Sequence, residues 1–377
     1  MNPLKKLSDL GQSVWYDYIR RDLYMGPELK RMIEEDGLAG MTSNPTIFEK
    51  AIADSELYDD DIRRYGGQKK SAADVFESLE VADVRGAADA FRKVYDATGG
   101  DDGFVSIEVG PGLARDTAES IEEAQRLWQS SARPNVMVKI PGTEEGVPAI
   151  RQCLAQGINI NITLLFSVER HRQVMEAYLS AMEERTAKGQ PVDRIRSVAS
   201  FFVSRVDTNV DKKLDAIAKD EKRSEADRKQ AKELRGKFGI ANARVAYEAF
   251  EEVFGGERFA KLKAKGVHVQ RPLWASTSTK DPAYPDLYYV EALIGPQSVN
   301  TLPPETFTAY RDHGDPKVRI HDDLEGAHAT FDGFQKLGID LAQVYRELED
   351  EGVKKFSDSY DKLLKAVEGK EAAVRVS

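Results

Sequence analysis

Three stretches decide the fold: FVSIEV at 104–109, VMVKI at 136–140 and ININITL at 158–164. Side chains alternate along a β-strand, so each stretch places its polar residues on one side and aliphatic residues on the other. In the first stretch, Ser106 and Glu108 lie opposite the valines and the isoleucine. Strands of an open parallel sheet are covered by helices on both faces and read as nearly continuous apolar runs, which these stretches do not.

Short strand-like runs recur along the chain, separated by longer segments with helical spacing. They span 13–18, 40–44, 104–109, 136–140, 158–165, 198–203, 272–276 and 298–302. Alternating strands and helices indicate a parallel sheet, either closed into one barrel or split between two doubly wound domains. The connections are too long for hairpins, so the polar sides would not face water. We therefore predict an α/β fold, a (β/α)8 TIM barrel whose polar strand faces point inward toward an active-site mouth.

Two connections look enlarged, near 49–103 and 207–270. We expect the whole chain, 1–377, to form a single barrel domain with these helical insertions. The second contains DKKLDAIAKDEKRSEADRKQAKELRGK, in which both charge signs are mixed. Such a segment is more typical of a solvated helical excursion than of a nucleic-acid-binding patch.

The composition narrows the functional classes. The chain has 377 residues, with 54 Lys and Arg against 64 Asp and Glu and a formal charge of −10, which argues against nucleic acid as a partner. The single cysteine, Cys153, excludes an internal disulfide framework, and a reducing cytoplasm is the expected setting. No apolar stretch approaches the ~20 residues needed to span a bilayer, so we expect neither secretion nor membrane insertion.

Lys139 is the most informative single residue, because it ends its strand on the inward side of the predicted barrel. A lysine at a strand end is more often a solvated surface group, but apolar walls would disfavour its ammonium form and leave neutral amine to attack a carbonyl. The resulting imine chemistry also needs acid and base groups. Glu108 and Asp17 share the inward side, and Thr163 could hold a water between the glutamate and the imine. Taken singly, each carboxylate could also be a capping or solvent-facing group.

Further short polar side chains are expected at the same end of the barrel: Asn44, Asn161 and Ser200. Around one lysine, such amide and hydroxyl groups suit a polyhydroxylated substrate. Asn44 precedes a proline and could instead simply terminate its strand. The scattered histidines suggest no metal site, and the chain lacks nucleotide-binding glycine motifs, so we predict no cofactor.

Several motifs together resemble the transaldolase family, the (β/α)8 class I aldolases of the pentose phosphate pathway. They are GMTSNPTIFEKAI (40–52), SIEVGPGLARDT (106–117), VMVKIPGTEEGVPAI (136–150), GININITLLFS (157–167), SFFVSRVD (200–207) and WASTSTK (274–280). The resemblance implies that Lys139 forms a Schiff base with a dihydroxyacetone unit from fructose 6-phosphate or sedoheptulose 7-phosphate. It also implies that Asp17 removes the C4 hydroxyl proton and that Glu108 and Thr163 act through a water.

The resemblance further assigns substrate contacts. Asn44, Asn161 and Ser200 match groups that hold the donor's hydroxyls, while Arg205 and Ser276 match contacts to its phosphate. The family pattern has an arginine shortly after that serine, whereas this chain reads Ser276-Thr-Ser-Thr-Lys280, so Lys280 is a weaker candidate because it lacks the fork geometry of arginine. Arg205 could alternatively pair with Asp207.

Phe202 separates two activities within the family. An aromatic hydroxyl there goes with release of free dihydroxyacetone, and a phenylalanine goes with transfer to an aldose phosphate such as glyceraldehyde 3-phosphate or erythrose 4-phosphate. The resemblance thus implies a transaldolase that acts on small sugar phosphates, as a monomer or homodimer. A fructose-6-phosphate aldolase and a sugar-phosphate-binding barrel without turnover remain the alternatives.

Overall fold

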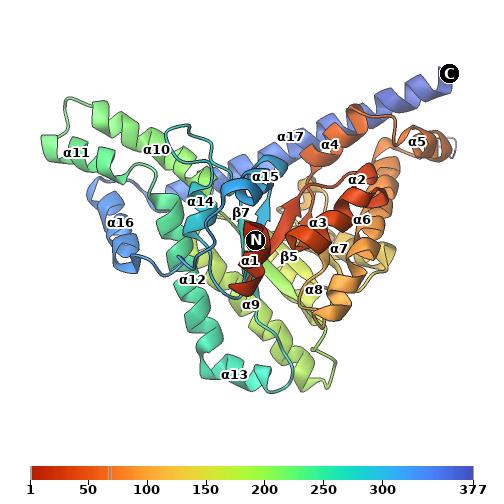
Figure 1. Ribbon diagram of the computed structural model, residues 1–377, viewed down its shortest axis with the longest axis horizontal. Helices are drawn as coiled ribbons and strands as arrows, with labels where there is room; N and C mark the ends of the chain where they lie inside the picture. Colours follow the sequence, from red (N-terminus) through yellow and green to blue (C-terminus); the bar gives the residue numbers. More distant parts are fainter. Residues whose placement is uncertain (1, 67, 69, 377) are drawn as a thin grey trace.

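The computed structural model describes residues 2–66, 68 and 70–376 and contains a closed barrel of parallel strands in the order β1 to β8. Figure 1 shows the helices that lie around these strands. This confirms the predicted (β/α)8 TIM barrel. The strands are β1 (Gln12–Asp17), β2 (Leu38–Thr42), β3 (Phe104–Glu108), β4 (Val136–Pro141), β5 (Ile160–Leu165), β6 (Ser197–Phe202), β7 (Arg271–Ala275) and β8 (Ser298–Leu302). All predicted strands are present, although β2 lies two residues earlier than expected, which leaves Asn44 outside it.

Helices surround the barrel. They are α1 (Pro3–Asp9), α2 (Arg21–Met25), α3 (Pro27–Asp36), α4 (Pro45–Ala53), α5 (Asp59–Gly66), α6 (Ala72–Ala97), α7 (Thr117–Ser131), α8 (Gly146–Ala155), α9 (Val168–Ala187), α10 (Ser204–Lys219), α11 (Glu225–Leu234), α12 (Phe238–Gly255), α13 (Glu257–Lys263), α14 (Tyr288–Ala292), α15 (Pro304–His313), α16 (Leu324–Lys336) and α17 (Leu341–Val376), with a short 3₁₀ turn at Pro111–Leu113. The long connections hold α5 and α6 in one case and α10 to α13 in the other. In the described part of the chain, no helix combines the length and the apolar character needed to cross a membrane.

The two sides of the strands take part in different apolar clusters. Val105 and Ile107 belong to the large cluster between the barrel and its helices. Trp15, Phe104 and Met137 belong to a second cluster, and the rings of the first two lie 6.3 Å apart although β1 and β3 are not neighbours. These three side chains therefore meet inside the barrel. Phe104 shares its side of β3 with Ser106 and Glu108, so the predicted inward orientation of the polar side is confirmed.

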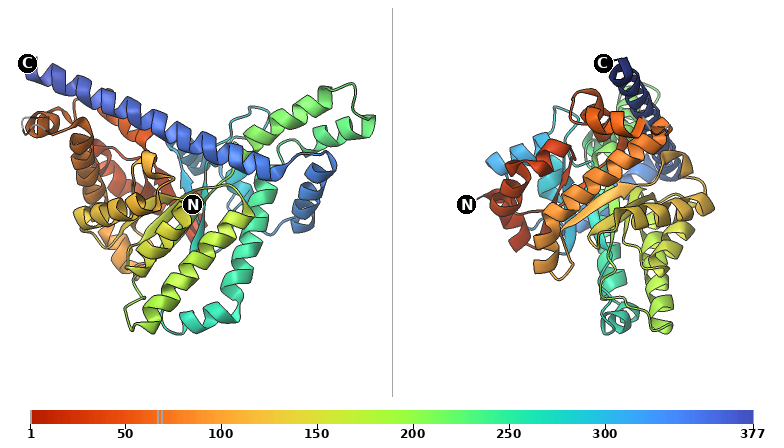
Figure 2. Two further views of the ribbon diagram at one scale, coloured as in Figure 1. Left: turned by 180° about the vertical axis from the view of Figure 1, so that it is seen from behind. Right: turned by 90° about the vertical axis from the view of Figure 1, so that its right-hand side faces the viewer.

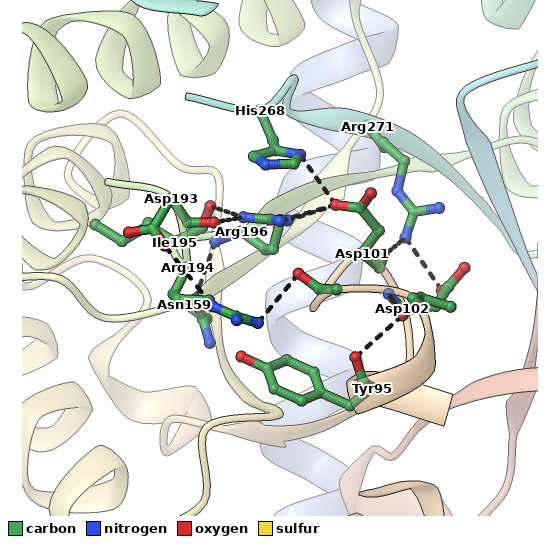
Figure 3. A network of polar contacts seen from close by, with 12 residues as sticks. Tyr95, Asp101, Asp102, Asn159, Asp193, Arg194, Ile195, Arg196, His268 and Arg271 are labelled. Atoms are coloured by element: carbon green, nitrogen blue, oxygen red, sulfur yellow. Dashed lines mark hydrogen bonds and ion pairs between the residues drawn. The ribbon is translucent and has the colours of Figure 1, made fainter. Parts of the chain in front are cut away.

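A polar network joins the segments that precede β3, β6 and β7 at the amino end of the barrel (Figure 3). Asp102 accepts hydrogen bonds from Trp15 Nε1 at 2.9 Å and from Arg271 Nη2 at 3.2 Å. Asp101 accepts from Arg196 Nε at 2.9 Å and lies 3.0 Å from His268 Nδ1. Because this end of such barrels carries stability rather than catalysis, we interpret the network as structural.

The C-terminal helix α17 lies across the opposite, carboxyl end of the barrel. It crosses most of the molecule in Figure 1 and in the left-hand view of Figure 2. A Cβ added to Gly352 in this helix would lie 2.9 Å from Leu164 of β5, so helix and barrel are in close contact there. The helix thereby covers part of the mouth toward which the predicted catalytic side chains point.

Candidate active site

The parallel register of the barrel brings the predicted catalytic residues together. Glu108 at the end of β3 pairs with Lys139 of β4, which in turn pairs with Asn161 of β5. Lys139 Nζ donates hydrogen bonds to Glu108 Oε2 and to the carbonyl oxygen of Ser43, both at 3.1 Å. The side chains of Lys139 and Glu108 are only 8% and 6% exposed. The amine is thus enclosed and held beside one carboxylate.

Two buried oxygens near this pair have no hydrogen-bond partner within the described part of the chain. One is Glu108 Oε1 and the other is Thr163 Oγ1. Burial raises the pKa of Glu108, and the nearby charge of Lys139 only partly opposes the rise. A raised pKa makes a carboxyl group a better proton acceptor and keeps a larger fraction of it protonated at a given pH, which suits general acid–base catalysis.

Asp17 lies at the end of β1 and faces the same cavity. Its Oδ1 accepts a hydrogen bond of 2.7 Å from Thr42 Oγ1, which is itself 2.7 Å from Thr301 Oγ1. Burial raises the pKa of Asp17, while the charge of Lys139 and the Thr42 hydrogen bond lower it. Thr42 and Thr301 were not among the predicted site residues, because a strand-end threonine carries no signal of its own.

The amide and hydroxyl groups predicted for the donor occupy different positions. Asn161 donates to Ser106 Oγ at 3.0 Å and accepts from Ser200 Oγ at 2.7 Å, so it lies within a buried hydrogen-bonded chain. Asn44 caps α4, its side chain accepting from the backbone N–H of Ile47 at 3.1 Å. This cap accounts for the end of the strand before Asn44, and the side chain still borders the cavity.

The predicted phosphate contacts, Arg205, Ser276 and Lys280, all line this cavity. The guanidinium of Arg205 lies 4.9 Å from the ring centre of Phe202, and burial lowers its pKa. It forms no ion pair with any carboxylate of the described residues, so the alternative pairing with Asp207 is not formed. Ser276, with a left-handed φ of 55°, lies 3.0 Å from Ser204 through their hydroxyls. Lys280 Nζ donates to Ser278 Oγ at 2.5 Å.

A cavity of about 190 Å³ joins these groups. All the predicted site residues line it except Glu108 and Asn161. These two do not line the cavity but hydrogen-bond to residues that do: Glu108 to Lys139, and Asn161 to Ser200. Lys355 and Phe356 of α17 line it as well, with Lys139 Nζ 5.7 Å from the centre of the Phe356 ring. Sequence reasoning missed both, because nothing in an amphipathic helix shows which distant surface it covers.

Comparison with known proteins agrees with this geometry. The family model for transaldolase and fructose-6-phosphate aldolase matches residues 14–367. The chain is 47% identical to a transaldolase of Saccharopolyspora erythraea, over 97% of this chain and 96% of the relative. It is also 47% identical to a transaldolase of Thermobifida fusca, over 97% of each, and 44% identical to transaldolase 2 of a Nostoc species, over 98% of each. The chain therefore belongs to the transaldolase/fructose-6-phosphate aldolase family.

Proposed function

We propose that this enzyme carries out the transaldolase reaction through an imine on Lys139. The donor would be fructose 6-phosphate or sedoheptulose 7-phosphate, and the acceptor glyceraldehyde 3-phosphate or erythrose 4-phosphate. The observation that carries the proposal is the enclosed Lys139 amine, 3.1 Å from the Glu108 carboxylate and facing the same cavity as Asp17. The remaining steps follow from what these three groups can do.

Imine formation needs a proton acceptor and a proton donor. The neutral amine of Lys139 attacks the C2 carbonyl, and the resulting carbinolamine loses its hydroxyl as water. Glu108 accepts the proton that the nitrogen loses and supplies a proton to the departing hydroxyl, acting through a second water held by Thr163, whose hydroxyl has no other partner within the described residues. The carbon–nitrogen double bond then draws electrons away from the donor's carbon chain.

Cleavage needs a base at the next carbon. Asp17 removes the C4 hydroxyl proton, the bond between C3 and C4 breaks, and its electrons pass into the imine while the aldose phosphate leaves. The dihydroxyacetone unit remains on Lys139 as an enamine and attacks the carbonyl carbon of the acceptor, whose oxygen takes up the proton held by Asp17. Hydrolysis of the resulting imine releases the new ketose phosphate and restores the Lys139 amine. Asn44, Asn161 and Ser200 would hold the donor hydroxyls, directly or, for Asn161, through Ser200.

Transfer is favoured over release by the side chain of Phe202. It borders the cavity and offers no hydroxyl that could protonate the enamine before the acceptor arrives. Ser276, Arg205 and Lys280 would bind the phosphate. We further propose that the chain works in a reducing cytoplasm, as one domain, without a cofactor, and as a monomer or homodimer.

Borohydride trapping tests the proposal. Incubation with fructose 6-phosphate and borohydride should add a reduced three- or six-carbon unit to Lys139, which peptide mass spectrometry would locate. The variant Lys139→Met keeps a side chain of similar length but has no amine. It should lose both labelling and turnover. Full turnover in that variant would exclude the imine mechanism. Labelling of the native enzyme without turnover would support the binding-protein alternative.

The acceptor distinguishes transfer from release. In the native enzyme, erythrose 4-phosphate should accelerate consumption of fructose 6-phosphate and give sedoheptulose 7-phosphate. If free dihydroxyacetone accumulated at the same rate with and without this acceptor, the chain would be an aldolase instead.

A further inference from the structure

Three positive side chains from distant parts of the chain converge on one cavity. Arg205 comes from α10, Lys280 from the segment after β7, and Lys355 from the long helix α17. All three line the cavity that contains Lys139. Figure 2 shows how α17 reaches this place: the helix lies across the molecule over the end of the barrel.

None of the three has a carboxylate within ion-pair distance in the part of the chain that the structure describes. Other lysines nearby are paired: Lys354 Nζ lies 2.6 Å from Asp358 Oδ2, and Lys213 Nζ lies 2.8 Å from Glu347 Oε2. Arg205, Lys280 and Lys355 therefore differ from these two lysines of the same region, which form ordinary ion pairs.

The surroundings of Lys355 are unfavourable for its positively charged form. The positive charge of Arg205 lowers the pKa of Lys355, with burial and Lys280 acting in the same direction. Two carboxylates border the cavity, Asp17 from β1 and Glu305 from α15, and a third, Glu351, lies one turn before Lys355 on α17. None of the three forms an ion pair with Lys355. Three positive side chains that line one cavity without an ion-pair partner among the described residues suit an anion with two negative charges.

We propose that Lys355 binds the phosphate of the sugar substrate and that α17 thereby helps to select phosphorylated over unphosphorylated ketoses. This proposal rests on the proposed function. It also accounts for the departure seen in the sequence, where no arginine follows shortly after Ser276 and the next positive side chain is Lys280. A lysine binds phosphate as a point charge, so two lysines beside Arg205 can supply the charge that a second arginine would bring.

The test compares two neighbouring lysines. The variant Lys355→Ala removes the cavity charge, and Lys354→Ala is the matched control because Lys354 is 73% exposed and paired with Asp358. Steady-state transfer would be measured with fructose 6-phosphate and with fructose as donors. In Lys355→Ala the ratio of the two kcat/KM values should fall about tenfold, the loss of one charge-assisted hydrogen bond, through a higher KM for the phosphorylated donor. The control should keep the native ratio.

Inhibition by inorganic phosphate is a second, independent measurement of phosphate binding. It should compete with fructose 6-phosphate in the native enzyme, and its inhibition constant should rise about tenfold in Lys355→Ala, with recovery in Lys355→Arg. Circular dichroism spectra would establish that each variant is folded. An unchanged donor ratio and an unchanged inhibition constant in a folded Lys355→Ala would overturn the proposal, even if Lys139 is still trapped by borohydride. If Lys139 of the native enzyme were not trapped at all, the proposed function itself would fail.

Discussion

Replacement of Thr42 by valine tests how the barrel controls the proposed base. Thr42 is 2% exposed and opposite Asp17 in the register of β1 and β2, and its hydroxyl donates the 2.7 Å hydrogen bond to the carboxylate. Valine has the same shape but donates no hydrogen bond. Since a hydrogen bond to a charged group contributes about 1.5–3 kcal/mol, its loss should destabilise the ionised form of Asp17 by that amount. At about 1.36 kcal/mol per pKa unit, the pKa of Asp17 should rise by roughly one to two units.

The assay is the pH dependence of kcat/KM for transfer from fructose 6-phosphate. Asp17 acts in its ionised form, so a higher pKa moves the acid limb of the profile to higher pH, by about one to two units in Thr42→Val. Thr301→Val is the matched control. It removes a contact to Thr42 and leaves the hydrogen bond from Thr42 to Asp17 in place, so its acid limb should move much less.

The reasoning would be refuted by an acid limb in folded Thr42→Val that coincides with that of the native enzyme, or lies at lower pH. Equal shifts in the two valine variants would also contradict it, because they would show that the shape of the cavity, rather than the hydrogen bond to Asp17, controls the base.

Three further predictions concern packing, charge and reaction outcome. Gly40→Ala should lower the free energy of unfolding by about 1–3 kcal/mol in urea titrations, because a Cβ there would lie 2.6 Å from the buried ring of Trp15. Burial of Asp101 is outweighed by its hydrogen bond from His268 and nearby positive charge, which lower its pKa to about 2, below the unfolded value of about 3.9. The stability from this group is therefore present above about pH 4 and lost as the pH falls toward 2, and Asp101→Asn should lack that part of the acid dependence. Phe202→Tyr should raise the proportion of donor released as free dihydroxyacetone, because the added hydroxyl can protonate the enamine. An enzymatic assay for dihydroxyacetone measures this proportion. An unchanged proportion would show that Phe202 does not favour transfer over release.

Part of the site could be predicted because parallel strands align their ends. Once the alternation in β3, β4 and β5 indicates a closed barrel, Glu108, Lys139 and Thr163 must lie at one end and on one side. The same reasoning cannot tell whether a side chain reaches the cavity. Glu108 hydrogen-bonds to Lys139 but does not line the cavity, and Asn44 caps α4 instead of ending β2.

The sequence by itself determined the barrel, the inward lysine and its acidic neighbours, because the period of two along a strand is a local property that residue types record directly. Only the tertiary structure decided that Thr42 supports Asp17 and that Lys355 and Phe356 close the cavity from α17. Those contacts join segments far apart in the chain. The pattern of a helix shows which of its faces is apolar, but the surface that this face covers depends on how the whole chain packs.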